Sequence, residues 1–276
     1  MEAGNPKPDK LCVHTITTKK WTLGEAVDAY SAEGIRGISV WQDAAAQAGI
    51  GTSRRILEAS DLEVVSYVRG GFFPSSSSSA RLAAIDNNRR MLDEAAELGS
   101  PLLVMVCGAD PKISLAHARE QIQLGLEAIL PYAEALGIKL GIEPLHPMYA
   151  DTRSAINTLG TANDLAAAID HPLCGVVIDV YHLWWDPALE VEIIRCGRKG
   201  KLFAYHICDW RVPTTDLLND RGLMGEGCIP LKEIRHWVQK AGFDGYHEVE
   251  IFSERHWARD PYEFLKDVVY AYHHHS

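Results

Sequence analysis

The sequence lacks several features, and each absence excludes a class of protein. It has no run of about 18 consecutive apolar residues, so we expect no membrane-spanning helix. The first eight residues, Met-Glu-Ala-Gly-Asn-Pro-Lys-Pro, contain no apolar signal-peptide core. The six cysteines are scattered, and none forms a Cys-x-x-Cys pair. We therefore expect reduced thiols in a cytoplasmic protein that has no membrane partner.

The sequence also has no excess of basic residues over acidic ones. Among 276 residues, 37 are acidic and 27 are lysine or arginine, which gives a formal net charge of −10. A broad nucleic-acid surface needs clustered Lys and Arg to bind phosphates, so we expect no nucleic-acid partner. The hydrophobic share of 47% and the charged share of 23% are typical of a soluble globular protein.

Apolar strands that stop at a candidate metal ligand form the strongest positive pattern. In Val176-Val177-Ile178-Asp179, an apolar run ends at a carboxylate, as in a buried parallel strand that reaches solvent. The chemistry of α/β folds lies at this carboxyl edge of the sheet. Four strands of this kind end at Glu143, Asp179, His206 and Glu250. Helix capping explains any one of them equally well, but four in one half of the chain are much harder to assign to capping.

Three carboxylates and one imidazole are suitable ligands for a divalent cation. Carboxylate oxygens bind hard ions such as Mg and Mn, and a histidine nitrogen also suits borderline ions such as Zn. We therefore expect one divalent metal ion (Mn, Mg, Co or Zn) as the cofactor.

Strand-like and helix-like segments alternate along nearly the whole chain. Thr22 with Glu25 three residues later forms a capping box that opens the first helix. Strict alternation implies a parallel sheet, and eight units imply that the sheet closes into a barrel. The sequence therefore predicts an α/β fold, a single (β/α)8 TIM barrel over residues 11–272. Residues 1–10 are expected to be a disordered leader, and the His-rich residues 273–276 a tail outside the barrel.

Two loops have features of a functional segment. The first, residues 70–79, begins with Gly70-Gly71-Phe72-Phe73-Pro74 and ends with five serines, so a flexible linker and a mobile lid both remain open. The second, residues 207–230, contains Asp209, Trp210 and Arg211. A loop of this length in a compact domain is usually functional or disordered.

The motifs at the strand ends resemble those of a known family. They are Ile142-Glu143-Pro144, Asp179-Val180-Tyr181-His182, Tyr205-His206-Ile207-Cys208-Asp209 and Gly225-Glu226-Gly227-Cys228-Ile229. Their order resembles the xylose-isomerase-like TIM barrels of the sugar phosphate isomerase/epimerase type. The resemblance implies that Glu143, Asp179, His206 and Glu250 bind one divalent metal, and that His182 lies beside the metal and contacts substrate.

One ligand position has two candidates, and two other positions depart from the family pattern. Glu248 and Glu250 have the same strand parity, so both could point into the barrel; Glu250 is chosen because it is nearer the strand's carboxyl end and lies in a family-like Val-Glu-Ile-Phe. The ketose epimerases also use a polar residue six after the first Glu and an Arg six after the metal His. Here those positions hold Tyr149 and Val212, with Arg211 one residue early.

The resemblance implies an isomerase or epimerase that acts on a ketose, sugar acid or sugar phosphate through a metal-stabilised enediolate. Glu143 and Glu250 are the expected acid/base pair, and His182 is expected to hold a substrate oxygen.

Four further residues are candidates for substrate binding, and three of them have a structural alternative. His146 follows Glu143 in a Pro-rich loop. His14 ends the first strand and could face the barrel mouth, although a lone histidine is more often a hydrogen-bonded core residue. Trp41 could form an aromatic wall or simply pack. Arg211 could clamp a phosphate or carboxylate, or pair with Asp209 on the surface.

Other functions compete with this one. A metal-dependent lyase, a decarboxylase or dehydratase, would act on a 3-oxo sugar acid or a dehydroshikimate-like oxo acid with the same groups, and the departures at Tyr149 and Val212 keep it close. A DNA-repair endonuclease would need a three-zinc cluster and a basic surface, against which the charge of −10 argues. A complete ligand set argues against a barrel that only binds sugar. Relatives often dimerise or tetramerise, so a homo-oligomer remains open.

Overall fold

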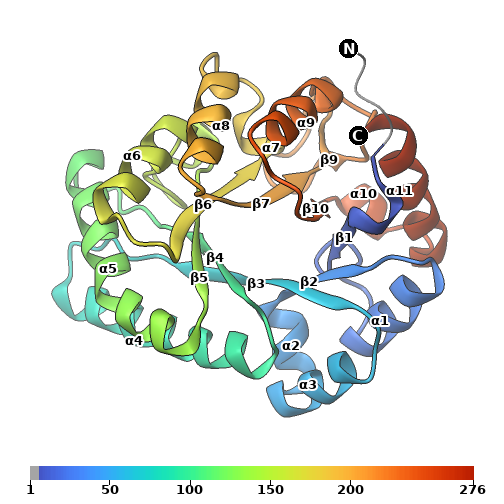
Figure 1. Ribbon diagram of the computed structural model, residues 1–276, viewed down its shortest axis with the longest axis horizontal. Helices are drawn as coiled ribbons and strands as arrows, with labels where there is room; N and C mark the ends of the chain where they lie inside the picture. Colours follow the sequence, from blue (N-terminus) through green and yellow to red (C-terminus); the bar gives the residue numbers. More distant parts are fainter. Residues whose placement is uncertain (1–5) are drawn as a thin grey trace.

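Eight parallel strands close into a barrel, which confirms the predicted fold (Figure 1). The computed structural model describes residues 6–276. Around the barrel the strands follow the order β1-β10-β7-β6-β5-β4-β3-β2. They are β1 (Leu11–His14), β2 (Gly37–Trp41), β3 (Glu63–Gly71), β4 (Leu102–Val106), β5 (Lys139–Glu143), β6 (Cys174–Asp179), β7 (Leu202–Ile207) and β10 (His247–Val249). Two short strands, β8 (Asp209–Trp210) and β9 (Arg221–Gly222), pair in an antiparallel way outside it.

Helices surround the barrel, as Figure 1 shows. The α-helices are α1 (Leu23–Ala32), α2 (Gln42–Ala48), α3 (Ile50–Glu58), α4 (Ser78–Glu97), α5 (Leu115–Leu136), α6 (Leu159–Ile169), α7 (Val180–Leu183), α8 (Leu189–Arg198), α9 (Leu231–Lys240), α10 (Glu254–Trp257) and α11 (Pro261–His275). Two 3₁₀ helices are η1 (Pro8–Lys10) and η2 (Pro147–Tyr149). No helix among residues 6–276 combines the length and the apolar character that a membrane crossing requires.

The hydrophobic core has two layers. The large layer joins the outward faces of the strands to the helices, and Leu103 and Met105 of β4 belong to it. The small layer comes from strands alone and includes Leu102 and Val104 of the same strand. Because side chains alternate along a strand, the second set points into the barrel. The inward positions nearest the carboxyl ends of the strands are therefore free to carry polar groups.

Local sequence signals account for several helix starts. The capping box of Thr22 and Glu25 is present at α1. The serine run is not a linker throughout, because Ser77 caps α4 and the helix begins at Ser78. The preceding serines are held as well: Gln121 Oε1 accepts from the backbone N–H of Ser75 at 2.9 Å. β3 also continues to Gly71, so the predicted loop begins later than expected.

Both predicted chain ends need correction. Residues 1–5 of the expected leader lie outside the described residues, but Pro8–Lys10 forms η1. The Tyr272 hydroxyl donates to the Lys7 carbonyl at 2.9 Å, which ties this segment to α11. At the other end, the expected tail continues α11 through His275, because no Gly or Pro interrupts the helix there.

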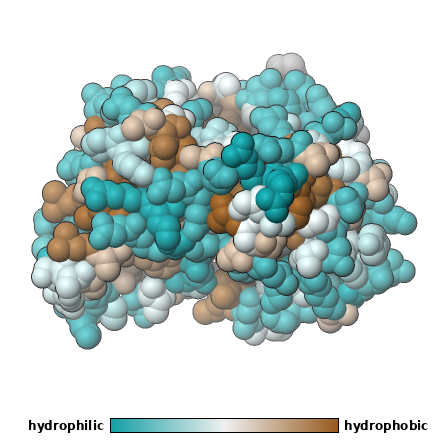
Figure 2. Space-filling model, turned by 90° about the horizontal axis from the view of Figure 1, so that it is seen from below, coloured by the Kyte–Doolittle hydropathy of each residue, from teal (hydrophilic) through white to brown (hydrophobic). Residues whose placement is uncertain are grey.

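The outer surface is mainly hydrophilic with separate hydrophobic areas, as Figure 2 shows for one face. Leu82 of α4 and Leu124 of α5 are each 64% exposed. These two leucines line one mainly apolar hollow between α4 and α5.

Candidate metal centre

The four predicted ligands meet at the carboxyl edge of the barrel. One ligand atom from each of Glu143, Asp179, His206 and Glu250 lies within 4.8 Å of the other three. All four side chains are buried. Strand register explains the meeting: Asp179 of β6 lies opposite His206 of β7, and Glu250 follows β10, which pairs with β7. The residues two positions earlier on three of these strands, Gly141, Val177 and Ala204, have the same inward parity.

The donor set fits a divalent cation. His206 Nδ1 lies 3.0 Å from Glu143 Oε1, yet both atoms are buried without a hydrogen-bond partner. Burial raises the pKa of Asp179 to about 7, although the positive charge of Arg221 opposes the shift. Burial lowers the pKa of His206, but Glu248 and Glu143 outweigh it and raise that pKa to about 10. Buried carboxylates that repel one another, with unsatisfied ligand atoms, are what a bound cation stabilises.

Arg221 is a central residue of the site that the sequence did not reveal. Its guanidinium is buried, and Nη1 donates to Asp179 Oδ2 at 3.0 Å and to Glu250 Oε2 at 2.8 Å. It also lies 4.4 Å from the ring centre of Tyr181. Arg211, the predicted clamp, instead pairs with Asp220 and does not line the cavity. Arg221 therefore occupies the place expected for Arg211.

His182 lies beside the ligands as a neutral imidazole. Burial lowers its pKa well below the usual value, and the charge of Arg221 lowers it further. Its Nε2 is 3.2 Å from Arg221 Nη2, which can only donate, so Nε2 accepts and the proton sits on Nδ1. That Nδ1 is buried without a partner. His182 therefore keeps an N–H without a partner, and its side chain lines the cavity.

The other predicted substrate-binding residues take different positions. Trp41 lines the cavity, and its indole N–H donates to His14 Nδ1 at 3.1 Å. His14 is fully buried between two acids, 3.1 Å from Glu248 Oε2 and 3.2 Å from Glu250 Oε1. His146 lies off the cavity against the rings of Trp185 and Trp210, at 5.6 and 5.2 Å between ring centres. Burial lowers the pKa of His146.

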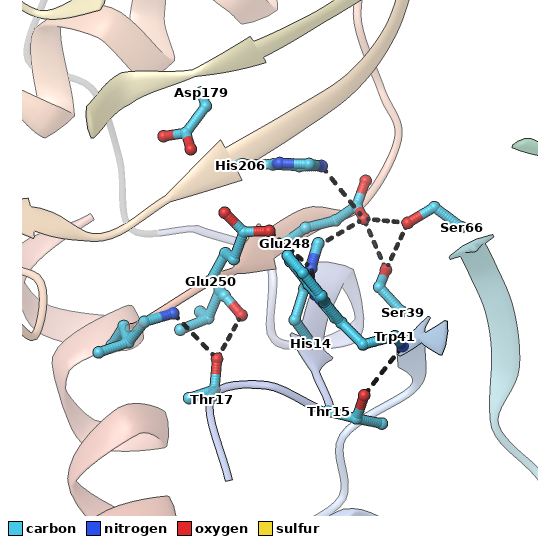
Figure 3. A network of polar contacts seen from close by, with 12 residues as sticks. His14, Thr15, Thr17, Ser39, Trp41, Ser66, Asp179, His206, Glu248 and Glu250 are labelled. Atoms are coloured by element: carbon cyan, nitrogen blue, oxygen red, sulfur yellow. Dashed lines mark hydrogen bonds and ion pairs between the residues drawn. The ribbon is translucent and has the colours of Figure 1, made fainter. Parts of the chain in front are cut away.

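The Glu248 carboxylate lies behind the predicted ligand His206 (Figure 3). Its Oε2 accepts from Ser39 at 2.6 Å and Ser66 at 3.0 Å, and lies 3.6 Å from His206 Nε2. Burial raises the pKa of Glu248, but His206 and His14 outweigh it and keep the carboxylate ionised. A carboxylate behind a ligating histidine fixes the ring orientation and leaves the other nitrogen for the metal.

We expect Glu248→Gln to weaken metal affinity by about 10- to 100-fold without unfolding the protein. The amide keeps the shape of the side chain but loses the charge that orients His206. Titration of metal-free protein with Mn²⁺ measures the change. Ser66→Ala is the matched control, since it removes the Ser66 contacts to Glu248 and Ser39 but leaves the carboxylate. Unchanged affinity in Glu248→Gln would contradict this role.

A narrow cavity with an interior volume of about 20 Å³ adjoins the predicted ligands. Glu143, Glu250, His182 and Arg221 line it, and so do Arg69 and Arg153. This volume holds about one water molecule and is well below the roughly 300 Å³ of the smallest small-molecule sites, so substrate entry requires the cavity to widen. The long loop after β7 closes over it, because the hydroxyls of Tyr149 and Tyr181 both donate to the Leu217 carbonyl, at 2.6 and 3.1 Å.

Both curated proteins and solved structures include relatives of this chain. Among curated proteins, the inosose isomerase of Halalkalibacterium halodurans is 22% identical over 199 residues, 71% of this chain and 68% of that protein. Among solved structures, the protein SMc04130 from Sinorhizobium meliloti 1021 is 45% identical, with a TM-score of 0.93 over 96% of this chain and 98% of that one.

A more distant solved structure has the same fold. The IOLI protein with a bound zinc atom is 20% identical, with a TM-score of 0.83 over 95% of this chain and 96% of that one. A sequence model of the family described as xylose isomerase-like TIM barrel matches residues 27–268. The match extends over most of the barrel, so the chain belongs to the xylose isomerase-like TIM-barrel family.

Proposed function

We propose that the protein is a divalent-metal-dependent isomerase or epimerase that acts on a ketose, a sugar acid or a sugar phosphate. The observation that carries this proposal is the buried cluster of Glu143, Asp179, His206 and Glu250 beside a small cavity. The similarity to an inosose isomerase supports the same reaction class.

The four clustered residues would hold the cation. When bound, the cation polarises a substrate carbonyl and stabilises negative charge that develops on its oxygen. The zinc atom in the IOLI structure supports a divalent ion. The donor set suits Mn, Mg, Co and Zn alike.

The protein's own groups would move the proton. Glu143 and Glu250 both line the cavity, so one carboxylate can take a proton from the carbon beside the carbonyl and the other can return it. Burial raises the pKa of Glu250, but Arg221 and His14 outweigh it and hold that pKa well below its usual value. Glu250 is therefore ionised, as a proton acceptor must be. The free N–H of His182 would donate to a substrate oxygen and hold the substrate in position.

A lyase remains the second candidate, and one observation favours it. The ketose epimerases place a polar residue six positions after the first glutamate, and Tyr149 stands there in this chain. Its hydroxyl donates to the Leu217 carbonyl and is thereby engaged within the protein. Loss of water or carbon dioxide from an oxo acid would need the same metal ligands and carboxylates.

Deuterium exchange separates these functions. Metal-loaded protein in deuterium oxide is incubated with ketoses, 3-oxo sugar acids and dehydroshikimate, and proton NMR follows each compound. We expect deuterium to enter the carbon beside the carbonyl, with the rest of the molecule unchanged. Loss of water or carbon dioxide would assign the protein to the lyases. No exchange on any compound by metal-loaded protein would contradict both proposals for this panel.

A further inference from the structure

With a divalent cation counted, the positive charges around the cavity outnumber the negative ones. Three ligand carboxylates, from Glu143, Asp179 and Glu250, face a divalent ion and the guanidinium of Arg221. These positive and negative charges cancel. Arg69 and Arg153 line the same cavity, and their two positive charges have no counterpart in this sum. Within residues 6–276, neither of these two arginines forms an ion pair with an Asp or Glu side chain.

Arg69 is held in place by rings and leaves one donor free. Its guanidinium lies 4.7 Å from the ring centre of Phe72 and 5.9 Å from that of Trp41. These contacts orient the planar group. Nη1 is buried and has no hydrogen-bond partner. A buried donor without a partner costs free energy, so a ligand that accepts from it binds more tightly.

Arg153 approaches from the loop that follows β5. Its guanidinium lies 5.5 Å from the ring centre of Tyr149. The loop backbone is fixed, because the N–H of Arg153 donates to the Tyr149 carbonyl and its own carbonyl accepts from Gly108, each at 2.9 Å. Burial lowers the pKa of Arg69, and the positive charge of Arg153 lowers it further. Two cations that share one small cavity repel each other until an anion lies between them.

We propose that Arg69 and Arg153 bind an oxyanion of the substrate, a carboxylate or a phosphate, at a position separate from the metal ligands. Guanidinium groups match both oxyanions through paired N–H donors. This inference rests on the proposed function and narrows it: the substrate is a small acidic sugar derivative or oxo acid rather than a neutral ketose.

Two matched pairs of probes test this inference without turnover. D-gluconate and D-glucitol differ only in a carboxylate, and D-fructose 6-phosphate and D-fructose only in a phosphate. Calorimetric titration of Mn²⁺-loaded protein at low salt measures the affinity for each. We expect at least one acidic probe to bind about 10- to 100-fold more tightly than its neutral counterpart. The preferred pair identifies carboxylate or phosphate as the recognised group.

Variants assign the preference to the two arginines. Arg69→Met and Arg153→Met should each remove most of it, and Arg69→Lys should retain part of it through the remaining charge. Arg89→Met is the control, because Arg89 is half-exposed on α4 and pairs with Asp86. Equal binding of acidic and neutral probes, or no binding by either acidic probe, overturns the inference. Deuterium exchange into a neutral ketose at the same rate in wild type and Arg69→Met would overturn it while leaving the proposed function intact.

Discussion

Replacing Glu250 with Gln is expected to lower turnover by about 10³-fold while the barrel stays folded. The amide has nearly the same shape, so packing against β7 and β1 is kept. It cannot carry the negative charge that Arg221 contacts at 2.8 Å, and it cannot accept a proton from substrate. We also expect weaker Mn²⁺ binding, because one of three ligand carboxylates is lost. Turnover at saturating metal separates the catalytic loss from the loss of metal.

The matched control for this variant is Glu254→Gln. Glu254 lies four residues later, is exposed and pairs only loosely with Lys19, at 3.5 Å. Full activity in Glu254→Gln and near-complete loss in Glu250→Gln would support the assigned roles. If Glu250→Gln kept full activity and Glu248→Gln lost it, then Glu248 would be the ligand, and the choice between these two inward-facing acids would be wrong.

The barrel and its ligand cluster could be predicted from the sequence because their signals are local. Each buried strand is a short apolar run, and each ligand follows such a run directly, as Asp179 follows Val177 and Ile178. Parallel pairing then brings the strand ends to one edge without further information. The parity of the strand could not separate Glu250 from Glu248, so that choice rested on the strand end and the family-like Val-Glu-Ile-Phe.

Arg221 could not be predicted in this way, because it follows a long loop and does not stand at the end of a barrel strand. Counting six residues from His206 gives Val212, since the segment 211–219 lies between the strand end and the arginine. The antiparallel pairing of Trp210 with Arg221 folds this segment back and returns Arg221 to the ligands. Counting backwards from the Gly225-Glu226-Gly227 turn would have placed it four residues earlier.

Arg69 and Arg153 could not be predicted from the sequence for a different reason. Arg69 stands in β3 directly before the Gly-rich segment, where the sequence indicated a linker or a lid. Arg153 lies in a loop that has no periodic pattern. Their meeting across the cavity depends on the barrel closing, which joins segments more than eighty residues apart. Two like charges that are brought together from distant segments produce no pattern within a short stretch of sequence.

Metal binding is expected to release protons and to strengthen with pH. The acids around His206 raise its pKa to about 10, so the metal-free protein holds a proton there at neutral pH. The pKa of Asp179, raised by burial, is about 7. A cation must displace the proton from His206 at every pH below about 10, and also that from Asp179 below about 7. Between pH 6 and pH 8, affinity for Mn²⁺ should therefore rise by about 10³-fold.

Calorimetry in buffers of different ionisation enthalpy counts the protons released. We expect about one at pH 8.5, where only His206 is protonated, and nearly two at pH 6. The His-rich end of α11 is the main competing binder, so the control replaces His273, His274 and His275 with Gln. That variant should release the same number of protons at the barrel site. Affinity that does not change between pH 6 and pH 8 would mean that His206 is already neutral without metal, and that the surrounding acids do not hold its proton.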